Sequence, residues 1–136
     1  MTYSLNQITT KADCDALIAL ANIDLDMLNH SRYMENRQYG TVSAGAASID
    51  AELQAVIAEK TGLESILATL PDGPSKAQMD TRIFKLGYKK RLLEERRGKT
   101  GSLALLQKEY ALSCIDKEIA ENDSYITALK SRKDEL

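Results

Sequence analysis

The stretch Leu70-Pro71-Asp72-Gly73-Pro74 holds both prolines of this 136-residue chain and lies at its midpoint. Proline costs a helix interior about 3 kcal/mol and disfavours helical angles in the residue before it. The stretch therefore predicts a chain reversal, and the proline-free residues on either side are free to form long helices. Leu and Ala dominate the apolar residues, whereas aromatic residues make up 5%. This composition is typical of helix packing and predicts an all-α fold without strands.

Helix-start and helix-stop signals divide the chain into four expected helices within a single domain, residues 1–136. The capping-box spacing at Thr10–Asp13 and again at Ser75–Gln78 marks two starts. Small residues and glycines near residues 40–47 and 98–101 mark two interruptions. We therefore expect helices at about residues 10–39, 46–70, 76–97 and 102–134.

Apolar residues recur every three or four positions in these segments, as in helices that bury one face. The second helix carries the series Ile49, Leu53, Val56, Lys60, Leu63, Leu67, Leu70. The fourth carries Leu105, Lys108, Leu112, Ile115, Ile119, Asn122, Ile126, Leu129. For the first helix we expect a packed stripe of Ala16, Leu20, Ile23, Met27, His30 and Met34, widened by Leu17, Ile18, Leu25 and Leu28.

Charge supports antiparallel pairing beside the reversal, because residues 41–74 carry a net charge of −4 and residues 75–99 a net charge of +6. Two architectures follow. If both small-residue tracts break the helices, the fold is an antiparallel four-helix bundle. If both tracts stay helical, it is a coiled-coil helical hairpin reversing at Pro71–Pro74, whose seams need a partner. Breaks at both tracts are the favoured interpretation.

No catalytic or cofactor-binding constellation stands out, so we expect a protein that is not an enzyme and binds no cofactor. Asp26 and His30 can share a helix face, but one histidine is too few for the metal sites found in helix bundles. Cys14 and Cys114 have no framework spacing, which predicts reduced thiols packed as small apolar residues.

Residues 85–99 carry seven basic and two acidic side chains together with Tyr88. Such a segment is a candidate surface for a polyanion or nucleic acid. Its candidate binding residues are Lys85, Lys89, Lys90, Arg91, Arg96 and Arg97. Pairing with an acidic neighbouring helix explains the same residues, and the chain's net charge of −2 favours that interpretation.

A charged-then-apolar leader is missing before residue 20, and no apolar run approaches the roughly 18 residues of a membrane span. We expect a cytoplasmic protein without a membrane partner. The last residues, Lys133-Asp134-Glu135-Leu136, match the endoplasmic-reticulum retention address, which matters only to a protein in the secretory route. A charged helix end is the favoured interpretation of these four residues.

Four segments, Thr10–Leu17, Ala68–Gly73, Ile115–Glu121 and Arg132–Leu136, together resemble a family of short, uncharacterised bacterial helical proteins. The resemblance spans most of the chain, and its motifs are helix caps, a turn and heptads. It implies a bacterial cytoplasmic setting and a coiled-coil-like fold. The family has no assigned activity, so the resemblance brings no functional residues.

The sequence therefore predicts a non-enzymatic helical protein–protein interaction or scaffolding protein, acting as a homodimer or with another helical protein. The basis is an excess of apolar residues over the needs of one seam, in the breadth of the first helix and in Leu92, Leu93, Leu103, Leu105 and Leu106. The alternative is an adaptor that binds a polyanion or nucleic acid through residues 85–99.

Overall fold

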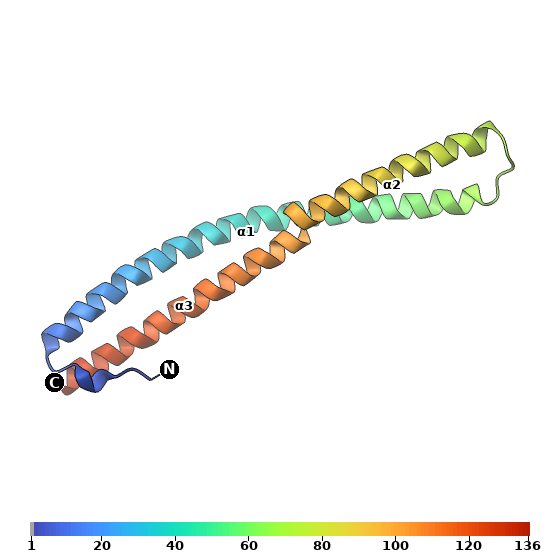
Figure 1. Ribbon diagram of the computed structural model, residues 1–136. Coiled ribbons are helices and arrows are strands. Elements are labelled where there is room, and N and C mark those ends of the chain that lie inside the picture. Colours follow the sequence, from blue (N-terminus) through green and yellow to red (C-terminus); the bar gives the residue numbers. More distant parts are fainter. Residues whose placement is uncertain (1) are drawn as a thin grey trace. The chain divides into compact units, whose positions relative to one another are not determined.

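The computed structural model describes residues 2–136, and its regular elements are all helices (Figure 1). A short 3-10 helix, η1, covers Leu5–Gln7. Three α-helices follow: α1 (Lys11–Leu67), α2 (Pro74–Thr100) and α3 (Ser102–Glu135). The described residues contain no strand, which confirms the predicted all-α fold class.

The predicted reversal joins α1 to α2 (Figure 1). Gly73 has a φ angle of 154°, a conformation that L side chains rarely adopt, so glycine is required there. Pro74 follows as the first residue of α2, where its missing N–H removes no helical hydrogen bond. The Pro-Asp-Gly-Pro sequence thus ends one helix and starts the next.

The two predicted helix starts differ in outcome. At the start of α1, the Thr10 hydroxyl accepts a hydrogen bond from the backbone N–H of Asp13 at 3.2 Å, as the capping-box spacing predicts. At the start of α2, the predicted cap at Ser75–Gln78 is wrong. The helix begins one residue earlier than Ser75, because Pro74 already fits its first turn, and no side chain caps this end.

The predicted interruption between residues 39 and 46 is also wrong, because α1 continues through it. Gly40 and Gly45 are both helical, at a cost of only about 1 kcal/mol each relative to alanine. The small residues here permit a close approach between helices. A Cβ atom on Gly45 would lie 3.8 Å from the carbonyl oxygen of Thr100, and Ala46 beside it is buried.

The second predicted interruption is present, but it is confined to Gly101. α2 extends through Gly98 to Thr100, and α3 begins at Ser102. The Gly101 N–H donates to the carbonyl oxygen of Arg97 at 3.1 Å. A Cβ atom on Gly101 would lie 2.5 Å from the Cα atom of Arg97, so only glycine fits this backbone without a shift.

One face of α1 explains its continuity. Alternating steps of four and three residues run without interruption from Cys14 to Leu70, and every position except Arg32 is buried or half-buried. We call these positions the inner seam: Cys14, Ile18, Ala21, Leu25, Leu28, Arg32, Glu35, Tyr39, Val42, Ala46, Ile49, Leu53, Val56, Lys60, Leu63, Leu67 and Leu70. The heptad phase is the same before and after Gly40 and Gly45. Packing of the seam residues on both sides therefore stabilises the helical conformation of these glycines.

The stripe predicted to pack in the first helix is wrong in register. Its members Ala16, Leu20, Ile23, Met27, His30 and Met34 are all exposed. Each follows an inner-seam residue by two positions, which is about 200° around the helix. The expected widening residues Ile18, Leu25 and Leu28 belong to the inner seam instead. The predicted series of Ile49 to Leu70 and of Leu105 to Leu129 are buried or half-buried throughout, as expected.

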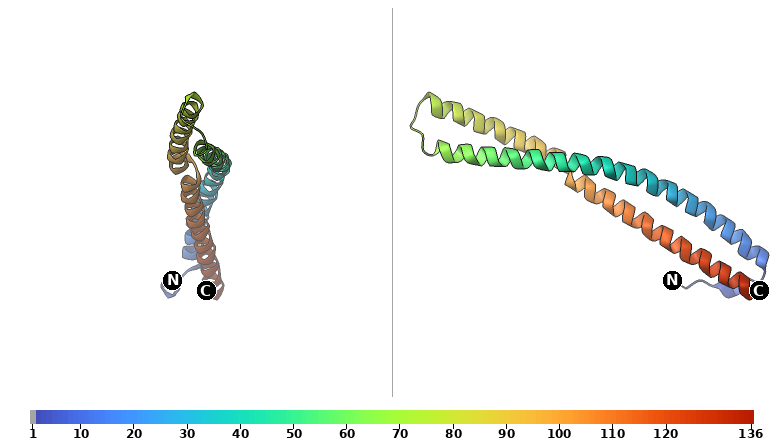
Figure 2. Two further views of the ribbon diagram at one scale, coloured as in Figure 1. Left: turned by 90° about the vertical axis from the view of Figure 1, so that its right-hand side faces the viewer. Right: turned by 180° about the vertical axis from the view of Figure 1, so that it is seen from behind.

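The described chain forms two compact units. Unit 2 comprises Gln38–Lys108, and in it the second part of α1 lies alongside α2 (Figure 2). Ion pairs join Glu59 to Arg82 at 2.7 Å and Asp50 to Arg97 at 3.6 Å, so the two helices are antiparallel. The core of this unit contains Leu53, Val56 and Leu93, with Leu86 packed against it.

Unit 1 comprises the residues up to Arg37 together with Glu109–Leu136, so the first part of α1 lies alongside α3 (Figure 2). Ion pairs join Asp15 to Lys133 at 2.6 Å and Arg32 to Asp116 at 2.5 Å, again in antiparallel order. Buried apolar side chains come from both helices: Cys14, Ala21, Ile126 and Leu129. The residues before α1 are held by Arg132, which donates to the carbonyl oxygen of Ile8.

Candidate functional site

The outward side of α2 carries three large apolar side chains in a line. Phe84, Tyr88 and Leu92 are spaced by four residues and are 78%, 57% and 40% exposed. The opposite side of α2, which includes Leu86 and Leu93, packs in the core of unit 2. Phe84 and Tyr88 line an open groove of about 430 Å³ with Lys60 and Glu64 of α1. Exposed aromatic rings beside such a groove are a candidate surface for another molecule.

Three of the six predicted polyanion-binding residues lie beside this line. Lys85, Lys89 and Arg96 are exposed, and their side chains form no ion pair within the described chain. Lys85 and Lys89 each directly follow an apolar member of the line. We call the six residues together the basic-aromatic face: Phe84, Lys85, Tyr88, Lys89, Leu92 and Arg96.

The other three predicted residues each form an ion pair within the chain. Lys90 is half-buried in the packed side of α2 and lies 3.9 Å from the carboxylate of Glu94. Arg91 is 3.8 Å from Glu95. Arg97 turns toward α1 and Ser102, where it pairs with Asp50 at 3.6 Å and donates to the Ser102 hydroxyl at 2.8 Å. Only Arg97 pairs with an acidic residue of the neighbouring helix, as the alternative interpretation of the sequence expected; Lys90 and Arg91 pair with glutamates of α2 itself.

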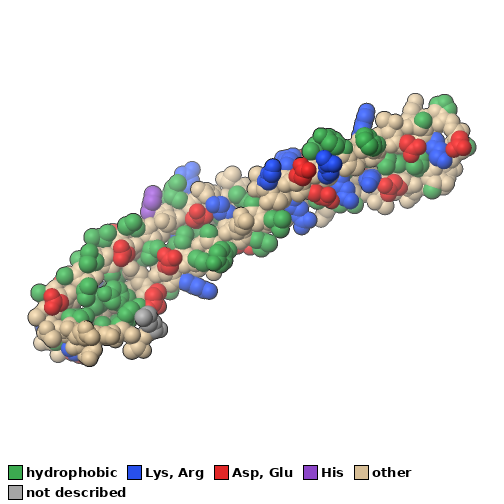
Figure 3. Space-filling view, viewed as in Figure 1, with side chains coloured by type: hydrophobic (Ala, Val, Ile, Leu, Met, Phe, Trp, Pro, Cys, Tyr) green, Lys and Arg blue, Asp and Glu red, His purple; other side chains and the backbone are tan. Residues whose placement is uncertain are grey.

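The exposed heptad positions of α1 form a second surface. Leu20, Ile23, Met27 and Met34 are between 42% and 65% exposed. We call these four residues the outer stripe. Figure 3 shows hydrophobic side chains on the surface along the first part of α1, and lysine and arginine side chains along α2. An apolar stripe with heptad spacing is the surface that another helix recognises.

Acidic residues flank the outer stripe on both sides. Asp24 directly follows Ile23, and Asp26 directly precedes Met27. Both aspartates are exposed, and neither has a hydrogen bond or ion pair within the described residues. The outer stripe is therefore apolar with acidic residues on both sides, whereas the basic-aromatic face is apolar with the basic residues Lys85, Lys89 and Arg96 along one side.

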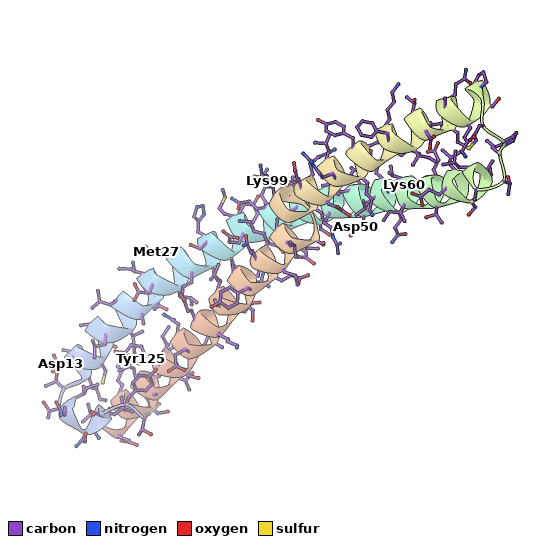
Figure 4. All side chains as sticks on the ribbon, turned by 45° about the vertical axis from the view of Figure 1, so that its right-hand side comes forward. Asp13, Met27, Asp50, Lys60, Lys99 and Tyr125 are labelled. Atoms are coloured by element: carbon purple, nitrogen blue, oxygen red, sulfur yellow. The ribbon has the colours of Figure 1, made fainter. Side chains whose placement is uncertain are left out.

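An open groove of about 500 Å³ in unit 1 adjoins the outer stripe. Asp24 and Met27 line it from α1, and Glu118, Glu121 and Tyr125 line it from α3; Figure 4 labels Met27 and Tyr125. The groove contains no basic side chain. It therefore extends the acidic border of the outer stripe onto α3.

Tyr3 also lines this groove and links the residues before α1 to α3. Its ring lies 5.0 Å from the ring of Tyr125, and its hydroxyl donates a hydrogen bond to the Glu121 carboxylate. That hydrogen bond, with the negative charge of Glu121, raises the pKa of Tyr3 above its ordinary value of 10.0. The phenol is therefore neutral at physiological pH and contributes a hydrogen-bond donor.

The two units differ in charge. Unit 1 contains seven basic and twelve acidic side chains, a net charge of −5. Unit 2 contains eleven basic and eight acidic side chains, a net charge of +3. The negative charge of the chain is therefore concentrated in unit 1 and the positive charge in unit 2.

The remaining sequence candidates do not form a site. His30 is exposed on α1 rather than in a seam, and no group of three His, Cys, Asp or Glu side chains in residues 2–136 is arranged to hold a metal ion. In the same residues, none of the helices combines the length and apolar character that crossing a membrane requires.

No protein-family model, curated protein or solved structure matches this chain. The resemblance to short bacterial helical proteins therefore stays a prediction, and function has to be argued from the surfaces. The sequence analysis named Lys85, Lys89 and Arg96 as candidates, gave no role to Phe84, and considered Asp26 only beside His30 as a metal site. The sequence does contain a signal for the exposed side of α2. Tyr88 and Leu92 each follow a half-buried residue by two positions, which is about 200° around the helix and places them on the opposite side.

Proposed function

We propose that this chain is a non-enzymatic helical interaction protein that works as a homodimer. The observation that supports this proposal is the outer stripe of α1. Its four apolar residues repeat at heptad spacing on the side of the helix opposite to the inner seam. One set of heptad positions packs within unit 1, and the second set is exposed and apolar at Leu20, Ile23, Met27 and Met34, with His30 between the two methionines.

Exposure of the outer stripe to water costs free energy that association can recover. Burial of a large aliphatic side chain contributes about 1.5–3 kcal/mol relative to exposure. Four such residues in one line give another helix several kcal/mol to gain, before the entropic cost of association. Coiled-coil contact with a helix is the arrangement that heptad spacing favours, which is why we propose a helical partner.

Light scattering after size-exclusion chromatography tests this function over the micromolar range. We expect a dimer for the wild-type protein and a monomer for the double variant Ile23→Glu with Met27→Glu. Because Ile23 and Met27 are 57% and 65% exposed, each substitution removes roughly half of the 1.5–3 kcal/mol of a full burial, and the two together correspond to at least about tenfold in the dissociation constant. Unchanged helical circular dichroism would show that the variant still folds.

A matched control is the double variant Ile57→Glu with Ile66→Glu. These two isoleucines are also partly exposed on α1, at 40% and 49%, but they lie outside the outer stripe. We expect this control to remain a dimer. A wild-type protein that stays monomeric throughout, or an Ile23→Glu, Met27→Glu variant that dimerises like the wild type, would contradict the proposed function.

A second candidate function is polyanion binding by the basic-aromatic face. It is favoured by three cations without intramolecular ion pairs next to the exposed rings of Phe84 and Tyr88. Lysine and arginine side chains neutralise phosphates, and aromatic rings stack with unpaired bases. Fluorescence anisotropy with a single-stranded oligonucleotide tests this candidate. Binding at low salt that weakens as salt rises would support it, and no binding at low salt would reject it.

A further inference from the structure

We propose that the outer stripe of α1 binds the basic-aromatic face of α2 in a second copy of this chain. The inference rests on the proposed function and names the partner surface that the function leaves open. Three observations support it. The two surfaces have similar spacing of apolar residues, the charged residues beside them have opposite sign, and the units that contain them have opposite net charge.

Three of the four outer-stripe residues match the apolar line of α2 in length. Leu20, Ile23 and Met27 span about 10 Å of α1 at 1.5 Å per residue. Phe84, Tyr88 and Leu92 span about 12 Å of α2 by the same measure. Flexible Met27 beside aromatic rings gives favourable sulfur–aromatic contacts. A helix pair can therefore cover both lines of exposed side chains at once.

The bordering charges are opposite. Asp24 and Asp26 border the outer stripe, and Lys85 and Lys89 border Phe84 and Tyr88. All four side chains are exposed without an ion pair among the described residues. Glu118, in the groove next to the stripe, adds a third carboxylate on the acidic side. Contact between the two surfaces gives each charged border a partner.

Contact between two like surfaces lacks this advantage. Two outer stripes would place the aspartates of one copy near those of the other, and two basic-aromatic faces would do the same with lysines. Like charges that face each other across a helix pair are unfavourable and set the choice of partner. The net charges of −5 for unit 1 and +3 for unit 2 act in the same direction at longer range.

A polyanion competes for only one of the two surfaces. It neutralises Lys85, Lys89 and Arg96 but leaves Leu20, Ile23 and Met27 in water. A second copy of the chain covers both surfaces. For this reason the second copy is the occupant we propose, and nucleic acid is an alternative outcome of the test.

Each contact joins two different surfaces, one from each copy. In a two-fold dimer the same contact occurs twice, and without closure it continues into an open chain of copies. Both arrangements depend on the same charged residues. Reversal of charge on either surface alone should therefore break self-association, and compensating reversals should restore it.

The experiment uses two charge-reversal variants of the full chain. Variant one carries Lys85→Glu and Lys89→Glu, and variant two carries Asp24→Lys and Asp26→Lys. We expect each variant alone to lose self-association by at least about tenfold in the dissociation constant. An equimolar mixture should regain it, because the acidic α2 of variant one then meets the basic α1 of variant two. Light scattering and sedimentation measure all three samples.

Control variants carry the same charge changes elsewhere. Lys117→Glu with Lys130→Glu, and Glu109→Lys with Asp123→Lys, change exposed residues of α3 outside both surfaces. These controls should associate like the wild type, and circular dichroism should show the same helicity in every variant.

The outcomes separate this inference from the proposed function. If the Ile23→Glu, Met27→Glu variant is monomeric but both charge variants still associate, or their mixture stays dissociated, the partner surface is wrong and the function stands. A monomeric wild type overturns both. If Lys85→Glu with Lys89→Glu abolishes binding of a single-stranded oligonucleotide without any change in self-association, the basic-aromatic face serves a polyanion and the inference is overturned.

Discussion

The side-chain Nδ2 group of Asn122 on α3 donates a hydrogen bond to the backbone carbonyl oxygen of Ala21 on α1, at 3.0 Å. The Oδ1 atom of the same amide is buried without a hydrogen-bond partner among the described residues. A polar residue at a heptad position favours one register of a helix pair, but a buried acceptor without a donor costs about 1–3 kcal/mol.

Replacement of Asn122 by leucine should therefore stabilise the protein. We expect Asn122→Leu to raise the free energy of unfolding by about 1 kcal/mol or more, since the unpaired oxygen is removed and apolar contact is gained. Urea denaturation followed by circular dichroism measures the change. Asn122→Ala is the comparison, because it removes the amide without filling its volume. A lower stability for the leucine variant would contradict this explanation.

Continuity of α1 predicts the effect of a change at Gly40. Because this residue is helical and no atom lies within 4 Å of the position that a Cβ atom would occupy, Gly40→Ala should stabilise the protein by about 0.5–1 kcal/mol. If residue 40 instead ended a helix in a left-handed conformation, alanine would destabilise the protein. Thermal denaturation of the variant distinguishes the two cases by the sign of the change.

Gly98 and Gly101 should respond oppositely to the same substitution. Gly98→Ala has room for its methyl group, with the nearest atom, in Leu103, 3.9 Å away, and should be neutral or stabilising. Gly101→Ala places Cβ 2.5 Å from the Cα atom of Arg97 and should destabilise the protein by about 1–3 kcal/mol through backbone strain. Equal unfolding midpoints for the two variants in urea would count against the local geometry at Gly101.

The Tyr3 hydroxyl should titrate above its ordinary pKa of 10.0, because its hydrogen bond to Glu121 and the charge of that carboxylate favour the neutral phenol. A pKa that is raised in the folded state gives stability that is fully present below pH 10 and is lost as pH rises through the raised pKa. Glu121→Gln should move the pKa of Tyr3 back toward 10. The chemical shift of the ring carbon that bears the hydroxyl, followed by NMR against pH, measures it, and an unchanged pKa would refute the cause.

The two free thiols should react at different rates. Cys14 is fully buried in unit 1, whereas Cys114 is only half-buried on α3. A thiol reagent should label one cysteine quickly in the native protein and both after denaturation. Cys114→Ser should remove the fast reaction and Cys14→Ser should leave it. Fast labelling of the Cys114→Ser variant would contradict the burial of Cys14 in the structure.

The reversal at Pro71–Pro74 and the all-α class could be predicted from the sequence, since proline and glycine act locally. The continuity of α1 through Gly40 was not predicted. Glycine alone suggests a helix end, and the prediction did not consider that the heptad series has the same phase before and after Gly40. The packed series that starts at Ile49 is connected back to Leu28 in steps of three and four through Ala46, Val42, Tyr39, Glu35 and Arg32. Their joint packing outweighs the small cost of two glycines.

The choice between the two stripes of α1 could not be made from hydrophobicity. Leu20, Ile23 and Met27 are individually more apolar than the buried Ala21, yet they face outward. The buried register keeps the heptad phase of the series from Ile49 to Leu70, which starts more than 25 residues after Ile23. The residues of the first segment alone do not contain that information. The basic residues of α2 were found by composition, but their division into paired and unpaired cations depends on the position of Asp50, Glu94 and Glu95.

The uninterrupted heptad phase of α1 constrains how the length of this chain can change. Deletion of one codon between residues 14 and 70 would rotate all later side chains of the helix by about 100° and turn the seam toward water. Removal or addition of seven codons would leave the rotation almost unchanged. Next to Gly101 the helix is already interrupted, so single-residue length changes are absorbed most easily there. Homologous chains should therefore differ in length in multiples of seven within α1 and by single residues near Gly101.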